Sequence, residues 1–401
     1  MKFHNKVIHI FSQLFLKGDK YVVIELLDHY IQITVLRTDF KTKQITITRA
    51  FSKEIPEFSA VSAIKEARQI LKKIPGLKKY KIILSLDSSF ATSMYSSVSL
   101  VRTNPKDVID EADLDNLISQ AIWRFFDKHR FKVAQKLNVD EVDVLLTDVR
   151  IRDIRIDGHR VVNPIGFKSK AVEIFFSQTF VTREFMRELR DVLPKENIVL
   201  MIEAGTALSH VLSHARGDSD FYIANLFPSH TAVFAASNQK FGHHDSFDWG
   251  GDDLKVFLGR YFRLDSGTAD LVVANYINEN ASGNFTRKFE TMLSQELNVF
   301  ANGIESLVGN KPADVYVNPF FTLPPVVFSD RFQNRFEKPI KLLPLSTNLI
   351  TEKLGYTLQY KTSVEVKNPL MLIGAILELT LLPQNDTMSH LANRRVRWLV
   401  T

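Results

Sequence analysis

Histidine clusters are the first places where this sequence could support chemistry. His210 and His214 lie four residues apart, which would put both imidazoles on one face of a helix, as in many zinc sites. His243, His244 and Asp245 form a second cluster. The first pair lacks the adjacent glutamate of a zinc-protease motif. We therefore interpret all four histidines as solvated residues of a helix and a loop, and we expect no metal site.

Two carboxylates beside one turn form another candidate. Glu25 and Asp28 lie where the first two predicted strands must be joined, so they could hold a cation or serve as ordinary turn residues. The chain has no cysteine, which excludes thiol nucleophiles, disulfides and zinc–thiolate sites. It also lacks the Gly-x-Ser-x-Gly elbow of many hydrolases. We expect no catalytic residues in this sequence.

The composition indicates a folded protein with more than one lobe. A chain of 401 residues exceeds what one hydrophobic core usually organises. The 51 Lys and Arg against 45 Asp and Glu give a net charge of +6, which favours acidic partners such as anionic lipid or an acidic peptide tail. Basic residues do not form a stripe interleaved with aromatics, so we expect no nucleic-acid partner. No apolar run is long enough for a membrane span, so we expect a cytoplasmic protein.

The elements that must position these residues occur as two copies of one order. The first copy has strands at 21–27, 31–37 and 44–51, a helix at 61–74 and a strand at 80–86. The second copy has strands at 221–227, 230–236 and 239–247, followed by a helix at 252–262. Such a repeat predicts a duplicated α/β lobe with a cleft between the copies. An apolar helix within 369–382 is expected to pack back on the first lobe.

A different unit separates the two copies. Apolar spacing predicts a helix over 114–136, then strands at 142–156 and 172–180, with Asp157-Gly158 as a turn. The run that follows contains Asn163, Pro164 and Gly166, all typical of turns.

The segment 157–173 resembles the small inserted subdomain of the FtsA family. The hairpin at 21–36, the Gly-Gly turn at 249–254 and the helix entry at 368–374 resemble other parts of the actin-fold proteins FtsA and PilM. The resemblance implies an α/β, actin-like (ribonuclease-H-type) two-lobed fold with an inserted small α+β subdomain. It also implies that Asp157, Gly158, Asn163, Pro164 and Gly166 belong to a subdomain used for self-association or partner contacts.

The expected division of the chain follows from these elements. It comprises an amphipathic segment (1–17), the first lobe (18–95, 181–218 and 351–386), the inserted subdomain (96–180), the second lobe (219–350) and a basic tail (387–401).

The resemblance also identifies three loops that hold ATP and Mg²⁺ in actin-fold ATPases. Glycine permits close approach of backbone amides to phosphate, yet Leu27, Phe227 and Pro319 stand in its place, and only 16 of 401 residues are glycine. The loop residues are Glu25, Leu27, Asp28 and Gln32; Asn225, Phe227, Ser229 and Thr231; and Asn318, Pro319 and Phe320. We interpret the loops as vestigial and expect no cofactor, leaving weak binding of ATP and Mg²⁺ open.

Both ends of the chain have a basic, amphipathic pattern. As a helix, the first segment would present one apolar face made of Phe3, Val7, Ile10, Phe11, Leu14 and Phe15. The tail carries Arg394, Arg397 and Trp398 and resembles a short form of the C-terminal membrane helix of FtsA-like proteins. Each end is either a membrane contact, or a helix docked on its own protein or a frayed terminus.

The leading interpretation is an FtsA-like adaptor, a pseudo-ATPase that links a cell-division assembly to the inner membrane face. One alternative is a PilM-like cytoplasmic scaffold of a type IV pilus machine, and another is an active ATPase with divergent loops. The expected partners are a division or pilus protein, with an acidic peptide tail as one candidate contact, a second copy of the chain, and an anionic membrane surface.

Overall fold

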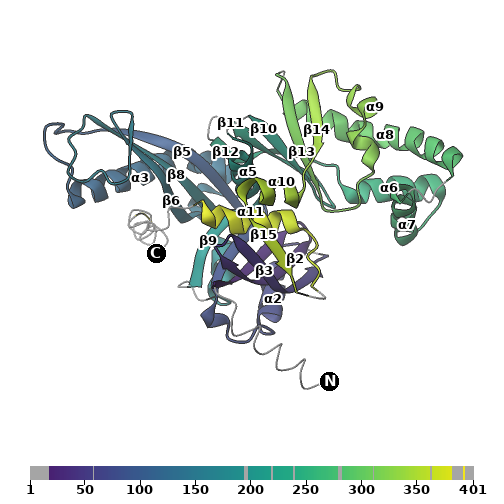
Figure 1. Ribbon diagram of the computed structural model, residues 1–401, viewed down its shortest axis with the longest axis horizontal. Helices are drawn as coiled ribbons and strands as arrows, with labels where there is room; N and C mark the ends of the chain where they lie inside the picture. The colour runs from purple at the N-terminus through teal and green to yellow at the C-terminus, as the bar shows by residue number, and fades with distance from the viewer. Residues whose placement is uncertain are drawn as a thin grey trace.

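The computed structural model describes residues 18–381 and 392, apart from 57, 194–196, 218–219, 238–239, 279–281, 310 and 362–363. Two sheets with helices on their faces lie on either side of a central helical layer, and a third, smaller sheet projects to one side (Figure 1). The expected two-lobed α/β fold with an inserted α+β unit is therefore confirmed.

The sheet of the first lobe has six strands in the order β15-β3-β2-β1-β4-β9. β1, β2 and β3 form an antiparallel meander, whereas β4 and β9 continue the sheet in parallel with β1. The alternation of Val, Ile and Thr explains these strands, because branched side chains pack well on a pleated surface. The strands are β1 (Asp19–Leu27), β2 (Tyr30–Asp39), β3 (Gln44–Glu54), β4 (Lys81–Leu86), β9 (Ile198–Glu203) and β15 (Thr357–Tyr360).

The sheet of the second lobe repeats this arrangement in the order β12-β11-β10-β13-β14. Its first three strands form an antiparallel meander, and β13 and β14 follow in parallel. The strands are β10 (Phe221–Leu226), β11 (Thr231–Ser237), β12 (Lys240–Phe247), β13 (Ala313–Pro319) and β14 (Ile340–Pro344). The duplication predicted from the order of elements is confirmed.

Two buried helices, α5 (Ala204–Arg216) and α11 (Pro369–Thr380), lie between the lobes. They belong to one hydrophobic core that also contains Tyr21 and Leu36 from the first sheet and Phe221 and Phe234 from the second. Asn368 caps α11 and Pro369 occupies its first turn, where the missing N–H costs no hydrogen bond. α11 contacts β1 and β4, as expected for a helix that returns to the first lobe.

The inserted unit is a four-stranded sheet, β5-β8-β6-β7, covered by one long helix. Its elements are β5 (Ala91–Val101), α3 (Glu111–Leu137), β6 (Val144–Ile156), β7 (His159–Val161) and β8 (Ala171–Thr182). The apolar stripe of α3 packs on this sheet, giving the insertion a core of its own. Ala392 is buried in the same core.

The remaining helices cover the outer faces and complete the two lobes. α2 (Ala60–Leu71) and α4 (Arg183–Arg190) pack on the first sheet. α6 (Gly251–Phe262), α7 (Ser266–Ile277) and α8 (Gly283–Leu307) lie beyond the second sheet (Figure 1). Two short helices, α9 (Asp330–Gln333) and α10 (Thr347–Leu354), lead into and out of β14.

Candidate functional site

The turns of the two meanders meet between the lobes. Asp28 lies in the β1–β2 turn, and Ser229 lies in the equivalent β10–β11 turn of the second lobe. The backbone N–H and the hydroxyl of Ser229 donate to Asp28 Oδ2 at 3.2 and 2.8 Å. The Nδ1 atom of His230 lies 3.6 Å from the same oxygen. The two lobes are therefore joined directly at the place where the family resemblance puts phosphate and Mg²⁺.

Charge stabilises this contact. Burial would raise the pKa of Asp28, but the close contact with His230 and the hydrogen bonds from Ser229 outweigh burial and lower it. Burial would lower the pKa of His230, but the close contact with Asp28 and the negative charge of Asp87 raise it. The shifts favour an anionic Asp28 paired with a cationic His230. Neither His230 nor Asp87 was among the predicted site residues.

Asp87, just after β4, forms a hydrogen bond with the β1–β2 turn. Its Oδ2 atom accepts the backbone N–H of Asp28 at 3.3 Å, and its Oδ1 atom accepts that of Ser89 at 2.9 Å. Burial raises the pKa of Asp87. Its position after the fourth strand, followed by two serines, is a turn signal that the sequence interpretation did not use.

Three aromatic rings fill the space beside the polar contact. The Phe227 ring lies 4.4 Å from that of Phe320 and 5.1 Å from that of His230, and Phe320 also meets Tyr30 at 6.5 Å. Phe227 is buried. The backbone N–H of Phe320 donates to Leu226 O at 2.9 Å, which fixes the aromatic residue in place.

The first turn of α6 is hydrogen-bonded to the turn of the second hairpin. The N–H groups of Gly251 and Asp252 donate to the carbonyls of Phe227 and Pro228 at 3.1 and 2.9 Å. A Cβ on Gly250 would lie 2.4 Å from the Pro228 carbonyl oxygen, so glycine is needed for this close packing. N–H groups at a helix start often bind phosphate, but here these two are used within the protein.

Glu25 is not a turn residue, because β1 places it inside the sheet. It is fully buried, and Gln32 Nε2 donates to its Oε2 at 2.6 Å. Burial raises the pKa of Glu25 to about 8, although the hydrogen bond from Gln32 opposes the shift. A carboxyl that is neutral near pH 7 is a poor cation ligand. The interpretation of Glu25 as an ordinary turn carboxylate was wrong, since long-range strand pairing decides its burial.

Three asparagine amides connect β13 to β10 and to the start of α11. Asn318 Nδ2 donates to Asn225 Oδ1 at 2.9 Å, and Asn368 Nδ2 donates to Asn318 Oδ1 at 3.3 Å. Thr231, whose hydroxyl donates to Trp249 O at 2.8 Å, holds the second meander to the turn before α6. Pro319 pairs beside Leu226 in the parallel ladder, and Leu27 is buried in the interlobe core. The predicted loop residues thus make contacts within the protein.

The histidine interpretation needs one correction. His214 is exposed, as expected, but His210 is buried and its Nδ1 atom lies 2.6 Å from Glu378 Oε2. Tyr95 donates to Glu378 Oε1 at 2.6 Å, and Arg152 Nη2 contacts the same oxygen. The partners lie on α5, α11, β5 and β6, so spacing within α5 alone could not reveal them.

Electrostatics couples this cluster tightly. Burial would raise the pKa of Glu378, but Arg152 and His210 hold it well below its usual range. Burial lowers the pKa of His210. The second histidine cluster is different: burial, together with nearby Lys136, lowers the pKa of His243 to about 3, while His244 is exposed. Among the described residues, no three His, Asp or Glu side chains are arranged as metal ligands.

The predicted insertion residues shape its loops. Asp157 has a φ of 47° and accepts the N–H of Ala171 at 2.8 Å, and Gly158 and Gly166 have φ values of 89° and 87°. Asn163 Oδ1 accepts the N–H of Ile165 at 3.1 Å, and Pro164 is buried.

Exposed apolar side chains surround these turns. Val162 is 96% exposed and Phe167 49% exposed, and Val101, Val108 and Ile165 of the same unit are exposed as well. We name these five residues the insertion-tip patch. Sequence reasoning missed them, although apolar residues within a turn-rich segment were a usable signal.

The membrane-contact residues lie outside the described part of the chain. They are Phe3, Val7, Ile10, Phe11, Leu14, Phe15, Arg394, Arg397 and Trp398. Of the helices within the described ranges, none has the length and apolar character needed to cross a bilayer.

Comparison with known proteins finds no matching family model and no matching curated protein. Among solved structures, the chain is similar to the PilM–PilN type IV pilus biogenesis complex. The identity is 12%, with 95% of this chain and 99% of that chain covered and a TM-score of 0.47.

Two further structures have a similar extent of match. One is the cytoplasmic domain of EpsL, an inner membrane component of the type II secretion system of Vibrio cholerae (10% identity, 90% and 95% covered, TM-score 0.34). The other is MreB5 of Spiroplasma citri bound to ADP (10%, 84% and 95%, TM-score 0.39). The duplicated meander and the matching strand orders of its two sheets make the chain an actin-fold protein, as its resemblance to FtsA and PilM implied.

Proposed function

We propose that this protein is a non-catalytic, actin-fold adaptor that joins a protein assembly to the inner face of a membrane. The observation that carries the proposal is the direct contact between the two hairpin turns, Asp28 with Ser229 and His230. In an actin-type ATPase, nucleotide phosphates and a cation would link the lobes. Here the protein's own side chains supply that link.

The donors and the space that ATP would need are already in use. Ser229 N–H is bonded to Asp28, and the first N–H groups of α6 are bonded to the second hairpin. The rings of Phe227 and Phe320 occupy the adjacent volume. Binding of ATP would have to break these contacts and expose buried apolar surface, which costs about 25 cal/mol per Å². The proposal therefore favours a pseudo-ATPase over an active enzyme.

The insertion-tip patch supports an adaptor role. Exposed apolar residues in the loops and strand ends of a unit with its own core are typical of protein interaction sites. The partner assembly in this proposal is of the division or pilus type implied by the FtsA and PilM resemblance. Self-association through the same patch is the second use that the resemblance implies.

A thermal-shift experiment tests the nucleotide part of the proposal. A ligand at 100 times its Kd stabilises the folded state by about 2.7 kcal/mol, which is easily detected as a rise in Tm. We expect millimolar ATP or ADP with Mg²⁺ to leave the Tm unchanged, both in the natural protein and in the Asp28→Asn variant. A Mg²⁺-dependent rise that Asp28→Asn abolishes would favour the active-ATPase alternative.

A second experiment tests the adaptor part. The double variant Val162→Asp with Phe167→Asp should no longer self-associate in sedimentation velocity. If the patch contacts a partner instead, the double variant should no longer capture the division or pilus protein encoded beside this chain. The matched control carries Val61→Asp and Leu271→Asp, which change exposed apolar residues elsewhere. Equal behaviour of the two double variants would exclude the insertion-tip patch as the contact.

A further inference from the structure

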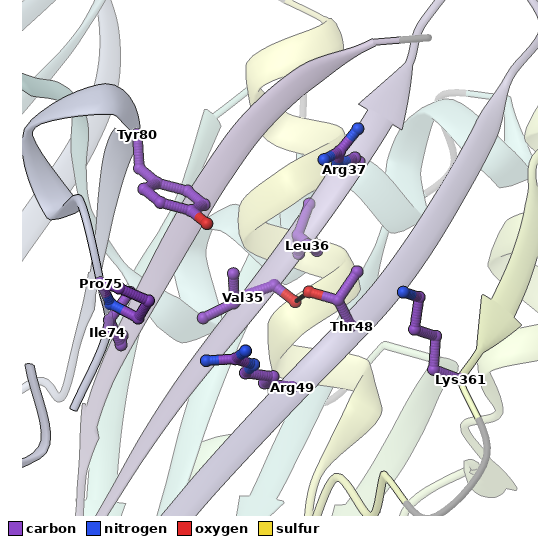
Figure 2. Close-up of a pocket in the computed structure, with 9 residues that line it drawn as sticks. All are labelled: Val35, Leu36, Arg37, Thr48, Arg49, Ile74, Pro75, Tyr80 and Lys361. Carbon is purple, nitrogen blue, oxygen red and sulfur yellow. Dashed lines mark hydrogen bonds between the residues drawn. The ribbon is translucent and has the colours of Figure 1, made fainter. Parts of the chain in front are cut away.

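A small pocket opens on the first lobe, away from the interlobe site. It has a volume of about 170 Å³ and lies where β2 and β3 pass the loop after α2. Figure 2 shows Tyr80 on one side of the pocket, Lys361 on the other, and the guanidinium groups of Arg37 and Arg49 above and below. Its other lining residues are Val35, Leu36, Thr48, Ile74 and Pro75.

Every charged side chain that lines the pocket is cationic. Arg37, Arg49 and Lys361 contribute three positive charges, and no Asp or Glu is present in the lining. Arg49 and Lys361 carry like charges without an ion-pair partner in the described part of the chain, and an anion in the pocket would offset their repulsion.

A strand irregularity lies in the wall of the pocket. The β2–β3 register shifts between Val35 and Leu36, leaving Thr48 as an extra residue on β3. Thr48 Oγ1 donates to Val35 O at 2.8 Å, so the irregularity is held in one geometry. Bulges re-aim nearby side chains, and here Arg49 follows the extra residue directly.

The surface around the pocket is also basic. Lys72, Lys73, Lys78 and Lys79 are exposed on the segment that supplies Ile74 and Pro75. Lys20 pairs directly opposite Arg37 in the β1–β2 ladder.

The described part of the chain begins with Gly18 at this same end of the sheet. Gly18 packs against Thr38, the neighbour of Arg37, because a Cβ on Gly18 would lie 2.5 Å from the Thr38 carbonyl oxygen. The pocket, the exposed lysines and the attachment point of residues 1–17 therefore share one side of the first lobe. A surface that met a membrane through residues 1–17 would bring the pocket to the lipid headgroups.

We propose that this pocket binds a phosphate group, and that the phosphate of an anionic membrane lipid is its source. Arginine forks bind phosphate oxygens in pairs, and the Tyr80 hydroxyl adds a further donor. Drug-sized ligands occupy pockets of about 300–1,000 Å³, so the smaller volume of about 170 Å³ suits a phosphate headgroup. The lipid source rests on the membrane-side location proposed above, whereas the phosphate site itself does not.

The test compares two double variants that lose the same charge. Arg49→Gln with Lys361→Gln alters the pocket, and Arg260→Gln with Lys341→Gln removes two exposed cations from the second lobe. All four side chains are exposed or half-buried, and circular dichroism with Tm confirms that each variant folds. The full chain is sedimented with vesicles of phosphatidylglycerol and phosphatidylcholine, or of phosphatidylcholine alone. Inorganic phosphate and glycerol phosphate are titrated separately in solution.

We expect binding to the anionic vesicles only, with the pocket variant at least about tenfold weaker and the control within about twofold. Glycerol phosphate should compete with the vesicles. If the pocket variant loses phosphate binding but both variants bind vesicles equally, the phosphate site stands and the lipid source is wrong. Equal vesicle losses in both variants, or no binding of either probe, would overturn the proposal. If the pocket variant still bound ATP, that binding would belong to the interlobe site. It would bear on the adaptor proposal and not on the phosphate pocket.

Discussion

Replacing Glu378 by glutamine should destabilise the protein strongly, although the two side chains have nearly the same shape. The carboxylate is fully buried and contacts Arg152, His210 and Tyr95 at the junction of α11, α5 and the insertion. The Arg152 side chain is only 12% exposed, so the substitution leaves a buried cation without its counter-charge. Breaking one partner of such a pair costs about 3–5 kcal/mol, and we expect a loss in this range.

Urea unfolding at pH 7 measures this effect. Glu352→Gln on the exposed face of α10 is the matched control and should cost less than about 0.5 kcal/mol. Adding Arg152→Met to Glu378→Gln should recover much of the loss, because the double variant buries no unpaired charge. A loss below about 1 kcal/mol for Glu378→Gln, or no recovery in the double variant, would refute the assigned role of this cluster.

Three further predictions concern other parts of the interlobe region. Because the pKa of His230 is raised in the folded protein, this residue stabilises the fold below pH 6.5, and the contribution is lost as the pH rises above that value. Because the pKa of Asp28 is lowered, its contribution to stability is lost as the pH falls below 3.8. Unfolding should therefore show that Asp28→Asn costs more at pH 5.5 than at pH 9. Ionising Glu25 is costly, because its pKa is raised to about 8. As the pH rises from 5 to 8, the Glu25→Gln variant should therefore gain stability relative to the natural protein, by up to about 1.4 kcal/mol per pH unit. A Cβ on Gly374 would lie 3.2 Å from the α5 backbone, so Gly374→Leu should lower stability by about 1–3 kcal/mol or more, unlike Gly283→Leu, where the space is open.

Much of the architecture could be predicted because it depends on local patterns. Alternating Val, Ile and Thr identified the meanders, and their repetition identified the duplicated lobes. The apolar run of α11 was correctly interpreted as a buried helix, although Glu378 interrupts it. The turn at Asp157-Gly158 followed from residue chemistry alone, since its positive φ values suit these two residue types.

The polar contacts between the lobes could not be predicted, because their partners are far apart in sequence. Glu378 and Arg152 are separated by 226 residues, and Asp28 and Ser229 by 201. The loop positions were found through the family resemblance, but not the fact that Ser229 bonds to Asp28. His230 was overlooked because a histidine beside a turn has no distinctive signal.

The measurement that tests the central claim most directly is Mg²⁺-dependent ATP turnover by the purified full chain. We predict a rate no higher than background, with Asp28→Asn and Glu25→Gln indistinguishable from the natural protein, because Asp28 is bonded across the lobes and Glu25 is buried and uncharged. Turnover above background that either isosteric substitution abolishes would contradict the claim that protein contacts have replaced the nucleotide.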